Sequence, residues 1–149
     1  MADKSKIGKE FPPFTWEVAS VKGKELMLAL GDNNPIYTDR KAALDAGYQD
    51  LPAPPTYLTL PLMWNNMISR IIQDLGVDFF NKTLHGEEEY EYFEEIYPGD
   101  VLTGSSKIAD IIEKSGKGKK MNLIVIETVY TNQKDEKVAS SKSVMIERV

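Results

Sequence analysis

The sequence of 149 residues contains no cysteine and a single histidine. The missing thiols exclude disulfides, iron–sulfur clusters, cysteine-ligated zinc and a cysteine nucleophile, and one imidazole excludes a multi-histidine metal centre within one chain. No apolar run approaches the roughly 18 to 20 residues that a membrane-spanning helix requires. The polar start, Met1–Lys6, lacks the apolar core of a secretory signal. We therefore expect a cytoplasmic protein that does not act at a membrane.

Basic residues are outnumbered by acidic ones. The chain has 18 lysines and arginines against 23 aspartates and glutamates, which gives a formal net charge of -5. Because binding to phosphates requires a basic surface, this balance argues against a general nucleic-acid binder. Hydrophobic residues at 42% and charged residues at 28% are typical of an ordinary globular protein. The length fits one domain, so residues 1–149 are expected to form a single domain.

The first half of the chain predicts one strand and short helices. The alternating segment Phe14–Val18 predicts a strand. Ser20 as N-cap and Gly31 as helix stop predict a helix over residues 21–30. Asp39 is the expected N-cap of a second short helix.

A long apolar pattern follows from Pro55 to Leu75. Apolar residues, Leu62 and Ile68 among them, repeat at three- and four-residue spacing and cover most of the helix circumference, which predicts a buried central helix. Pro61 predicts a kink or a loose turn near Tyr57.

The second half changes to a period of two, which predicts strands. A turn-forming segment at Ser115–Lys119 predicts a hairpin tip between two of them. One strand, a helical insertion and an antiparallel meander together predict an α+β fold, in which the sheet wraps around the central helix. The predicted strands of the meander are one that ends near Tyr97–Asp100, then Val101–Glu113, Met121–Thr131 and Val138–Val149.

The turn-rich segment Gly31–Tyr37 carries a resemblance to a known family. Its Gly-Asp-Asn-Asn-Pro-Ile resembles the Gly-Asp-x-Asn-Pro-Ile signature of the MaoC-like (R)-specific enoyl-CoA hydratases. The chain is most similar to their N-terminal-type domain, which also serves as a subunit of (3R)-hydroxyacyl-ACP dehydratases. The resemblance implies the hotdog fold. Further motifs in family order are Ile7–Glu10, Ala42-Ala43 to Gly47-Tyr48, Ala53–Tyr57, Leu84–Glu87 and Pro98–Asp100.

In the catalytic members, an aspartate and a histidine on this loop hold the water that adds across an enoyl thioester. Asp32 matches the aspartate, but Tyr37 stands at the histidine position. A phenol with an ordinary pKa near 10 is a poor base at neutral pH, so the catalytic dyad is half present. Asp32 therefore either holds the loop by bonding local backbone groups or still takes part in chemistry with help from elsewhere. His85 is a candidate replacement base if the fold or a partner brings it near Asp32, although a hydrogen-bonded structural histidine is the commoner outcome.

The resemblance implies an acyl-binding site next to this loop, at the start of the central helix. Amide groups there polarise the thioester carbonyl in hotdog enzymes. In this chain Pro54 and Pro55 have no amide hydrogen, which favours a rigid helix entry. The candidate substrate-binding residues are Asn34, Pro35, Pro55, Thr56 and Tyr57.

Glutamates are dense between Glu87 and Glu95. We expect a solvated face paired with Lys107, Lys114 and Lys142 on other strands, and no metal site. The lysines near the hairpin tip, at positions 114, 117, 119 and 120, are too few for nucleic acid and are at most contacts for coenzyme A or a carrier protein.

Three functions remain open from the sequence. The first is a hydro-lyase subunit that binds enoyl or 3-hydroxyacyl thioesters beside a catalytic hotdog partner. The second is a self-sufficient homodimeric hydratase that uses Asp32 with His85 or Tyr37, and the third is a non-catalytic acyl-CoA-binding module. A thioesterase is disfavoured, because the first carboxylate of the predicted helix is Asp74, near its far end. No cofactor is implied, since the CoA or carrier-protein thioester is the substrate. A homodimer or heterodimer is expected, because one curved sheet leaves an edge uncovered.

Overall fold

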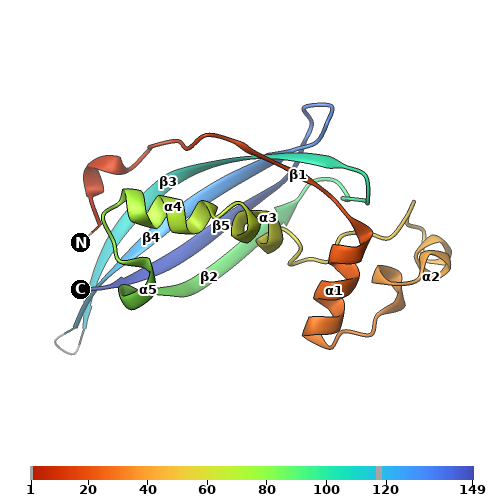
Figure 1. Cartoon of the computed structure of the whole chain (residues 1–149), viewed down its shortest axis with the longest axis horizontal. Coiled ribbons are helices and arrows are strands. Elements are labelled where there is room, and N and C mark those ends of the chain that lie inside the picture. The colour runs from red at the N-terminus through yellow and green to blue at the C-terminus, as the bar shows by residue number, and fades with distance from the viewer. Residues whose placement is uncertain (1, 117–118) are drawn as a thin grey trace.

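An antiparallel five-stranded sheet forms the body of the molecule (Figure 1). The computed structural model describes residues 2–116 and 119–149. The strand order across the sheet is β1-β3-β4-β5-β2, so β1 and β2 are its two edges. The elements are β1 (Phe14–Glu17), α1 (Ser20–Leu30), α2 (Arg40–Asp45), α3 (Thr59–Trp64), α4 (Met67–Asp74), α5 (Phe79–Lys82), β2 (Thr83–Tyr92), β3 (Val101–Gly116), β4 (Lys119–Thr131) and β5 (Lys137–Arg148), with short 3-10 turns at Lys4–Lys6 and Pro35–Tyr37.

Helices α3 and α4 lie across one face of the curved sheet (Figure 1). Ile71 and Ile72 of α4 are fully buried and belong to the same core as Ile108 of β3 and Ile124 of β4. Burying a side chain of this size stabilises the fold by about 1.5 to 3 kcal/mol, so this layer supplies much of the stability. The predicted α+β architecture, an antiparallel sheet wrapped around a helical layer, is confirmed. The predicted meander holds for β3, β4 and β5, whereas β2 pairs with β5 at the far edge and not with β3.

The single long helix expected from Pro55 to Leu75 is wrong. Residues 55–58 form turns, the helix begins at Thr59, and it is interrupted at Asn65 and Asn66. Asn66 has a left-handed φ of 52°, which an α-helix cannot contain. Pro61 causes no kink, because it is the third residue of α3, where an amide hydrogen has no intrahelical partner.

Smaller departures affect the first helix. Ser20 is the first residue of α1 and not its N-cap, a place taken by Ala19 without a side-chain hydrogen bond. Gly31 ends the helix with a φ of 70°, and the Asp39 side chain caps α2, as predicted. The predicted hairpin tip between β3 and β4 includes residues 117 and 118, which lie outside the described residues.

The two ends of the long axis carry different elements (Figure 1). Helices α1 and α2, with the loop between them, project beyond one end of the sheet. Helix α5 and the start of β2 lie at the opposite end. None of the helices in the described ranges has the length and apolar character needed to cross a lipid bilayer.

Candidate functional site

The loop after α1 is held by its own polar side chains. The Asp32 carboxylate accepts a hydrogen bond from the Asn34 amide at 2.9 Å, and the Asn34 side chain accepts one from the Ile36 amide at 3.3 Å. The Asp32 amide donates to the Met27 carbonyl at 3.0 Å, which ties the loop to α1. Asp32, Asn34 and Pro35 are exposed. One carboxylate oxygen of Asp32 therefore shapes the loop, and the side chain stays open to solvent.

Tyr37, which the family resemblance leads us to expect in the place of a histidine, is half-buried beside Asp32. Burial raises the pKa of its phenol, and the neighbouring Tyr48, Asp32 and Glu95 raise it further. Tyr37 is consequently a neutral phenol at pH 7, able to donate a hydrogen bond but not to take a proton. It borders a gap of about 10 Å³, no more than one water molecule requires, against Pro54 and other residues that precede α3.

The segment before α3 departs from the expected thioester-polarising helix start. The Tyr57 amide donates to the Pro54 carbonyl at 2.8 Å, so it is not available to a substrate oxygen. The Tyr57 hydroxyl is buried and accepts hydrogen bonds from Trp16 Nε1 and the Ala19 amide, both at 3.3 Å. Pro55 and Thr56 are exposed. Of the two candidate binding residues here that have an amide hydrogen, Tyr57 is thus a core residue and Thr56 lies at the surface.

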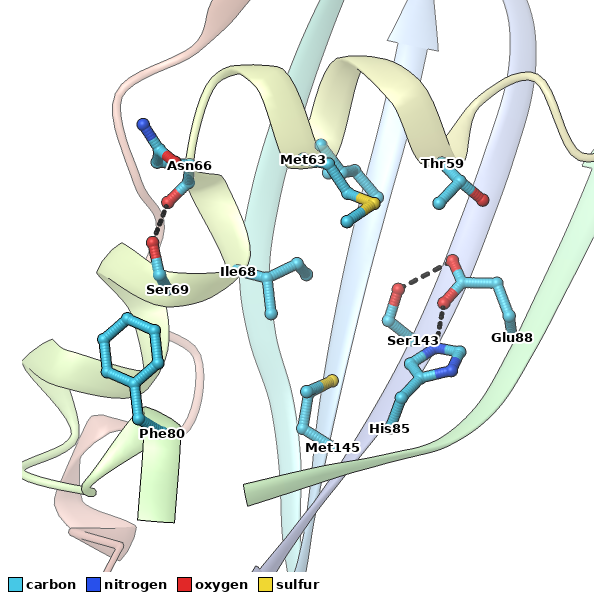
Figure 2. A pocket seen from close by; sticks show the side chains of 11 residues that line it. Thr59, Met63, Asn66, Ile68, Ser69, Phe80, His85, Glu88, Ser143 and Met145 are labelled. Carbon is cyan, nitrogen blue, oxygen red and sulfur yellow. Dashed lines mark hydrogen bonds and ion pairs between the residues drawn. The ribbon is translucent and has the colours of Figure 1, made fainter. Parts of the chain in front are cut away.

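His85 lies on the inner face of β2 and pairs with a carboxylate. Its Nε2 is 2.8 Å from Glu88 Oε2, and Ser143 Oγ of β5 donates to the other Glu88 oxygen at 2.7 Å (Figure 2). In a regular strand, residues three apart point to opposite faces. Here the register of β2 against β5 shifts between His85 and Glu87, so Gly86 is an extra residue that brings both side chains to one face.

This hydrogen-bonded group forms the polar wall of a cavity between α3–α4 and the sheet (Figure 2). The cavity measures about 540 Å³, within the usual range for small-molecule sites of about 300 to 1,000 Å³. Most of its open surface is apolar, and it comes from both helix pieces, α5, β2 and β5. The lining residues are Thr59, Leu62, Met63, Asn66, Ile68, Ser69, Phe80, His85, Glu88, Ser143 and Met145.

Hydrogen bonds connect the cavity wall to the start of α3. Thr59 Oγ1 and the Tyr90 hydroxyl are in contact, and Tyr90 also lies close to Glu88. Burial raises the pKa of the Tyr90 phenol to about 12, so this group stays protonated across the physiological range. Further along β2, the Tyr92 hydroxyl donates to the Pro55 carbonyl at 2.7 Å. Strand β2 thus carries a row of polar groups from the cavity toward the loop of Tyr37.

The structure brings Asp32 and Tyr37 together but not His85. Within one chain, the loop of Asp32 and the start of β2 lie at opposite ends of the molecule (Figure 1). His85 is a hydrogen-bonded strand histidine, the commoner outcome that the sequence suggested. The sequence did not reveal Glu88 as its partner, Ser143, or the cavity, although the glycine inside the strand pattern was a signal for a bulge.

The glutamate run is exposed as predicted, apart from Glu88. The expected use of Lys107 for this run is wrong, because Lys107 pairs with Glu127 at 3.1 Å. In residues 2–116 and 119–149, no three His, Cys, Asp or Glu side chains are gathered as a metal site would require.

Comparisons with known proteins agree with this architecture. The model of the family described as "FAS1-like, dehydratase domain region" matches residues 5–141. A UPF0336 protein of Saccharopolyspora erythraea is 32% identical over 149 residues, which covers 98% of this chain and 91% of that protein. A MaoC-like dehydratase structure has a TM-score of 0.81 at 24% identity, over 97% of this chain and 42% of that chain. The HadBC (3R-hydroxyacyl-ACP dehydratase) complex from Mycobacterium tuberculosis has a TM-score of 0.75 at 20% identity, over 92% of each chain. The two structures share the hotdog fold, and the chain belongs to the FAS1-like dehydratase domain region family.

Proposed function

We propose that this chain is the acyl-binding subunit of a hydro-lyase that acts on enoyl or 3-hydroxyacyl thioesters of CoA or a carrier protein. In this proposal the chain shapes the acyl site, and a second hotdog chain supplies the acid–base pair. The loop beside the thioester belongs to this chain and contains Asp32, Asn34, Pro35 and Tyr37. In this proposal the Tyr37 hydroxyl donates a hydrogen bond to the substrate.

The observation that carries the proposal is the environment of Tyr37. Hydration of an enoyl thioester requires a group that exchanges a proton near neutral pH. Burial and the neighbouring Asp32 and Glu95 move the pKa of the Tyr37 phenol away from that range. Tyr37 therefore does not supply a base next to Asp32, which suits a subunit that binds substrate beside a catalytic partner. Among the solved relatives in fold, HadBC is a complex of different chains.

The cavity under α3 and α4 supports the binding half of the proposal. Most of its open surface is apolar, and Leu62, Ile68, Phe80 and Met145 are among the residues that line it. An acyl chain placed there leaves water at about 0.8 kcal/mol per methylene, which favours binding of longer chains. Thr59 lies on the same side of the cavity as Glu88 and Ser143 (Figure 2), and it begins the helix that follows Thr56 and Tyr57.

A binding experiment on the purified chain tests this assignment. Isothermal titration calorimetry with decanoyl-CoA is expected to show binding without any hydro-lyase turnover. Met63→Trp places a bulky ring at the cavity, from a side chain that is 66% exposed, and should weaken binding by about tenfold or more. Leu28→Trp, at an 85% exposed position of α1, is the matched control and should leave binding unchanged. Equal effects of the two variants, or no binding by the unmodified chain, would contradict the cavity as the acyl site.

The His85–Glu88 pair favours a second candidate function. A carboxylate that orients an imidazole is an arrangement used in acid–base catalysis, and this pair faces the cavity. The alternative is a hydratase that works without a partner chain of another kind. Hydration of crotonyl-CoA by the purified chain, lost in His85→Ala and retained in Tyr37→Phe, would establish this alternative.

A further inference from the structure

The polar side chains that line the cavity gather in two places (Figure 2). Asn66 and Ser69 lie at and just after the break between α3 and α4, where the Ser69 hydroxyl donates to the Asn66 carbonyl at 2.9 Å. The larger group lies across the cavity, on β2, β5 and the start of α3. Because most of the open surface is apolar, an acyl chain in the cavity meets this larger group within an otherwise hydrophobic wall. The larger group consists of His85, Glu88, Ser143 and Thr59.

The hydrogen-bond donors of this group point at one another and not into the cavity. An ionised carboxylate only accepts hydrogen bonds, so the Ser143 hydroxyl and His85 Nε2 both donate to Glu88, at 2.7 Å and 2.8 Å. The Tyr90 hydroxyl, which is in contact with Thr59 Oγ1, is a further hydrogen-bond partner of Glu88. A neutral imidazole that donates from Nε2 accepts at Nδ1. The capacity that Glu88, His85 and Ser143 have left is therefore that of an acceptor.

The backbone of β2 holds this acceptor group in place. The extra residue Gly86 turns His85 and Glu88 to the same face, and a Cβ at Gly86 would lie 3.0 Å from the Val144 carbonyl oxygen. The Glu88 side chain is only 17% exposed, whereas that of His85 is 57% exposed. A half-enclosed carboxylate costs free energy unless its hydrogen bonds are made. An unsubstituted acyl chain that reaches this group displaces water from it and returns no hydrogen bond.

The length of β2 indicates where along an acyl chain this group acts. At the other end of the strand, the Tyr92 hydroxyl donates to the Pro55 carbonyl at 2.7 Å, and Tyr92 lies near enough to Tyr37 to influence it electrostatically. Residues 88 and 92 of one strand are separated by about 13 Å, at about 3.3 Å per residue. An extended hydrocarbon with carbon–carbon bonds of about 1.5 Å covers that length in about ten carbons.

We propose that the cavity selects an acyl chain with a hydroxyl group about ten carbons from the thioester, and that this hydroxyl donates a hydrogen bond to Glu88 or His85. The thioester then lies beside Tyr37, as in the proposed function, on which this assignment rests. A hydroxyl supplies the donor that the group lacks, whereas an ether oxygen at the same position would face only lone pairs. A site that hydrogen-bonds a substrate hydroxyl discriminates against the analogue without it, because its buried polar atoms are then left unpaired.

Isothermal titration calorimetry with four ligands on one carbon skeleton tests this selectivity. The ligands are decanoyl-CoA, 10-hydroxydecanoyl-CoA, 10-methoxydecanoyl-CoA and 3-hydroxydecanoyl-CoA. We expect 10-hydroxydecanoyl-CoA to bind about tenfold more tightly than decanoyl-CoA. The methoxy ligand accepts but does not donate a hydrogen bond, and the 3-hydroxy ligand carries its donor at the thioester end. Neither of these two ligands should share the gain.

Two variants identify the residues that recognise the hydroxyl. Glu88→Gln replaces one acceptor oxygen by a donor amide, and His85→Phe removes the imidazole from a side chain that is 57% exposed. Each should reduce the preference for 10-hydroxydecanoyl-CoA to about twofold or less, while decanoyl-CoA still binds. Glu91→Gln makes the same change at an exposed position of β2 outside the cavity lining, and it should keep the full preference. If Glu88→Gln shows no cooperative thermal unfolding, His85→Phe alone decides the outcome.

Three results would overturn the assignment of a hydroxyl site. They are equal binding of decanoyl-CoA and 10-hydroxydecanoyl-CoA, a gain shared by the methoxy ligand, and a preference that persists in the folded variants of Glu88 and His85. A gain for 3-hydroxydecanoyl-CoA in place of the 10-hydroxy ligand would also overturn it, and would favour the alternative hydratase. Binding of decanoyl-CoA without any preference refutes the hydroxyl site alone, whereas failure of all four ligands to bind the unmodified chain refutes the proposed function as well.

Discussion

Replacing Tyr37 by histidine should create hydratase activity in the chain alone. Tyr37 is half-buried with Asp32 and Glu95 close enough to influence its phenol. An imidazole at this position has an ordinary pKa near 6.5. Nearby carboxylates favour its protonated form, whereas burial favours its neutral form, so the two effects oppose each other. Tyr37→His would therefore supply, beside Asp32, a group that exchanges protons in the physiological range.

The expected increase in hydration rate depends on the catalytic groups that the site contains and on those that it lacks. One positioned proton-transfer group contributes about 10² to 10⁴-fold. The Tyr57 amide donates to Pro54 at 2.8 Å and cannot stabilise a developing oxyanion. A missing oxyanion donor costs about 10² to 10³-fold in other enzymes. Because the unmodified chain and the variant both lack this donor, we expect Tyr37→His to raise crotonyl-CoA hydration by about 10² to 10⁴-fold over the unmodified chain, while both absolute rates stay low.

The assay compares hydration rates of purified variants between pH 6 and 9. Tyr37→Phe is the matched control and should stay at the rate of the unmodified chain. Asp32→Asn in the Tyr37→His background should remove the gain, because the water is then no longer oriented by a carboxylate. A folded Tyr37→His variant that binds decanoyl-CoA yet hydrates no faster than the unmodified chain would refute the placement of Tyr37 at the base position.

Three further predictions concern the fold that supports the site. Gly86→Ala brings a Cβ to 3.0 Å from the Val144 carbonyl oxygen, so it should lower the unfolding free energy by about 1 to 3 kcal/mol in urea titrations. An unchanged unfolding free energy would contradict the close contact between Gly86 and β5. Leu62→Asp puts an unpaired carboxylate in the core, where Leu62 is 3% exposed, and should yield no cooperative thermal transition. Although burial alone would raise it, hydrogen bonds from Asn122 and an amide hold the pKa of Glu147 below its usual value. Glu147 should therefore stabilise the fold above about pH 4.5 and lose that effect as pH falls, and Glu147→Gln should flatten the dependence of the melting temperature on pH.

Local sequence patterns were sufficient to predict the strands of the sheet and the ends of the short helices. The strands β3, β4 and β5 follow the period-two pattern, since one of their faces packs on the helices. Gly31 and Asp39 end and begin helices by backbone conformations and hydrogen bonds that involve only neighbouring residues. Sequence signals that involve only neighbouring residues do not depend on the rest of the fold.

The departures arise where tertiary structure decides. Pro61 suggested a kink, but only the position of the helix start shows that a proline is harmless there. The left-handed Asn66 interrupts a continuous apolar pattern, and the pattern itself cannot reveal the break. Ile68 was expected in the core with Leu62, yet it is partly exposed at the cavity, because the break turns α4 relative to the pattern of one long helix.

The residues of the candidate site likewise fall into those that the sequence could predict and those that only the structure reveals. Asp32 and Tyr37 were identified from one contiguous loop, and the structure keeps them side by side. His85 and Glu88 meet only because Gly86 shifts the strand register, and Ser143 reaches them from another strand. Contacts that depend on a bulge and on strand pairing require the three-dimensional structure.

The central claim is that this chain binds the acyl group and a second hotdog chain carries the acid–base pair. The most direct measurement is the crotonyl-CoA hydration rate of two samples at equal amounts of this chain. One sample is the chain purified alone, and the other is the chain isolated with its associated partner from the source cell. We predict turnover only in the second sample, together with a hotdog chain that has aspartate and histidine five positions apart. Equal turnover by the chain alone would contradict the claim.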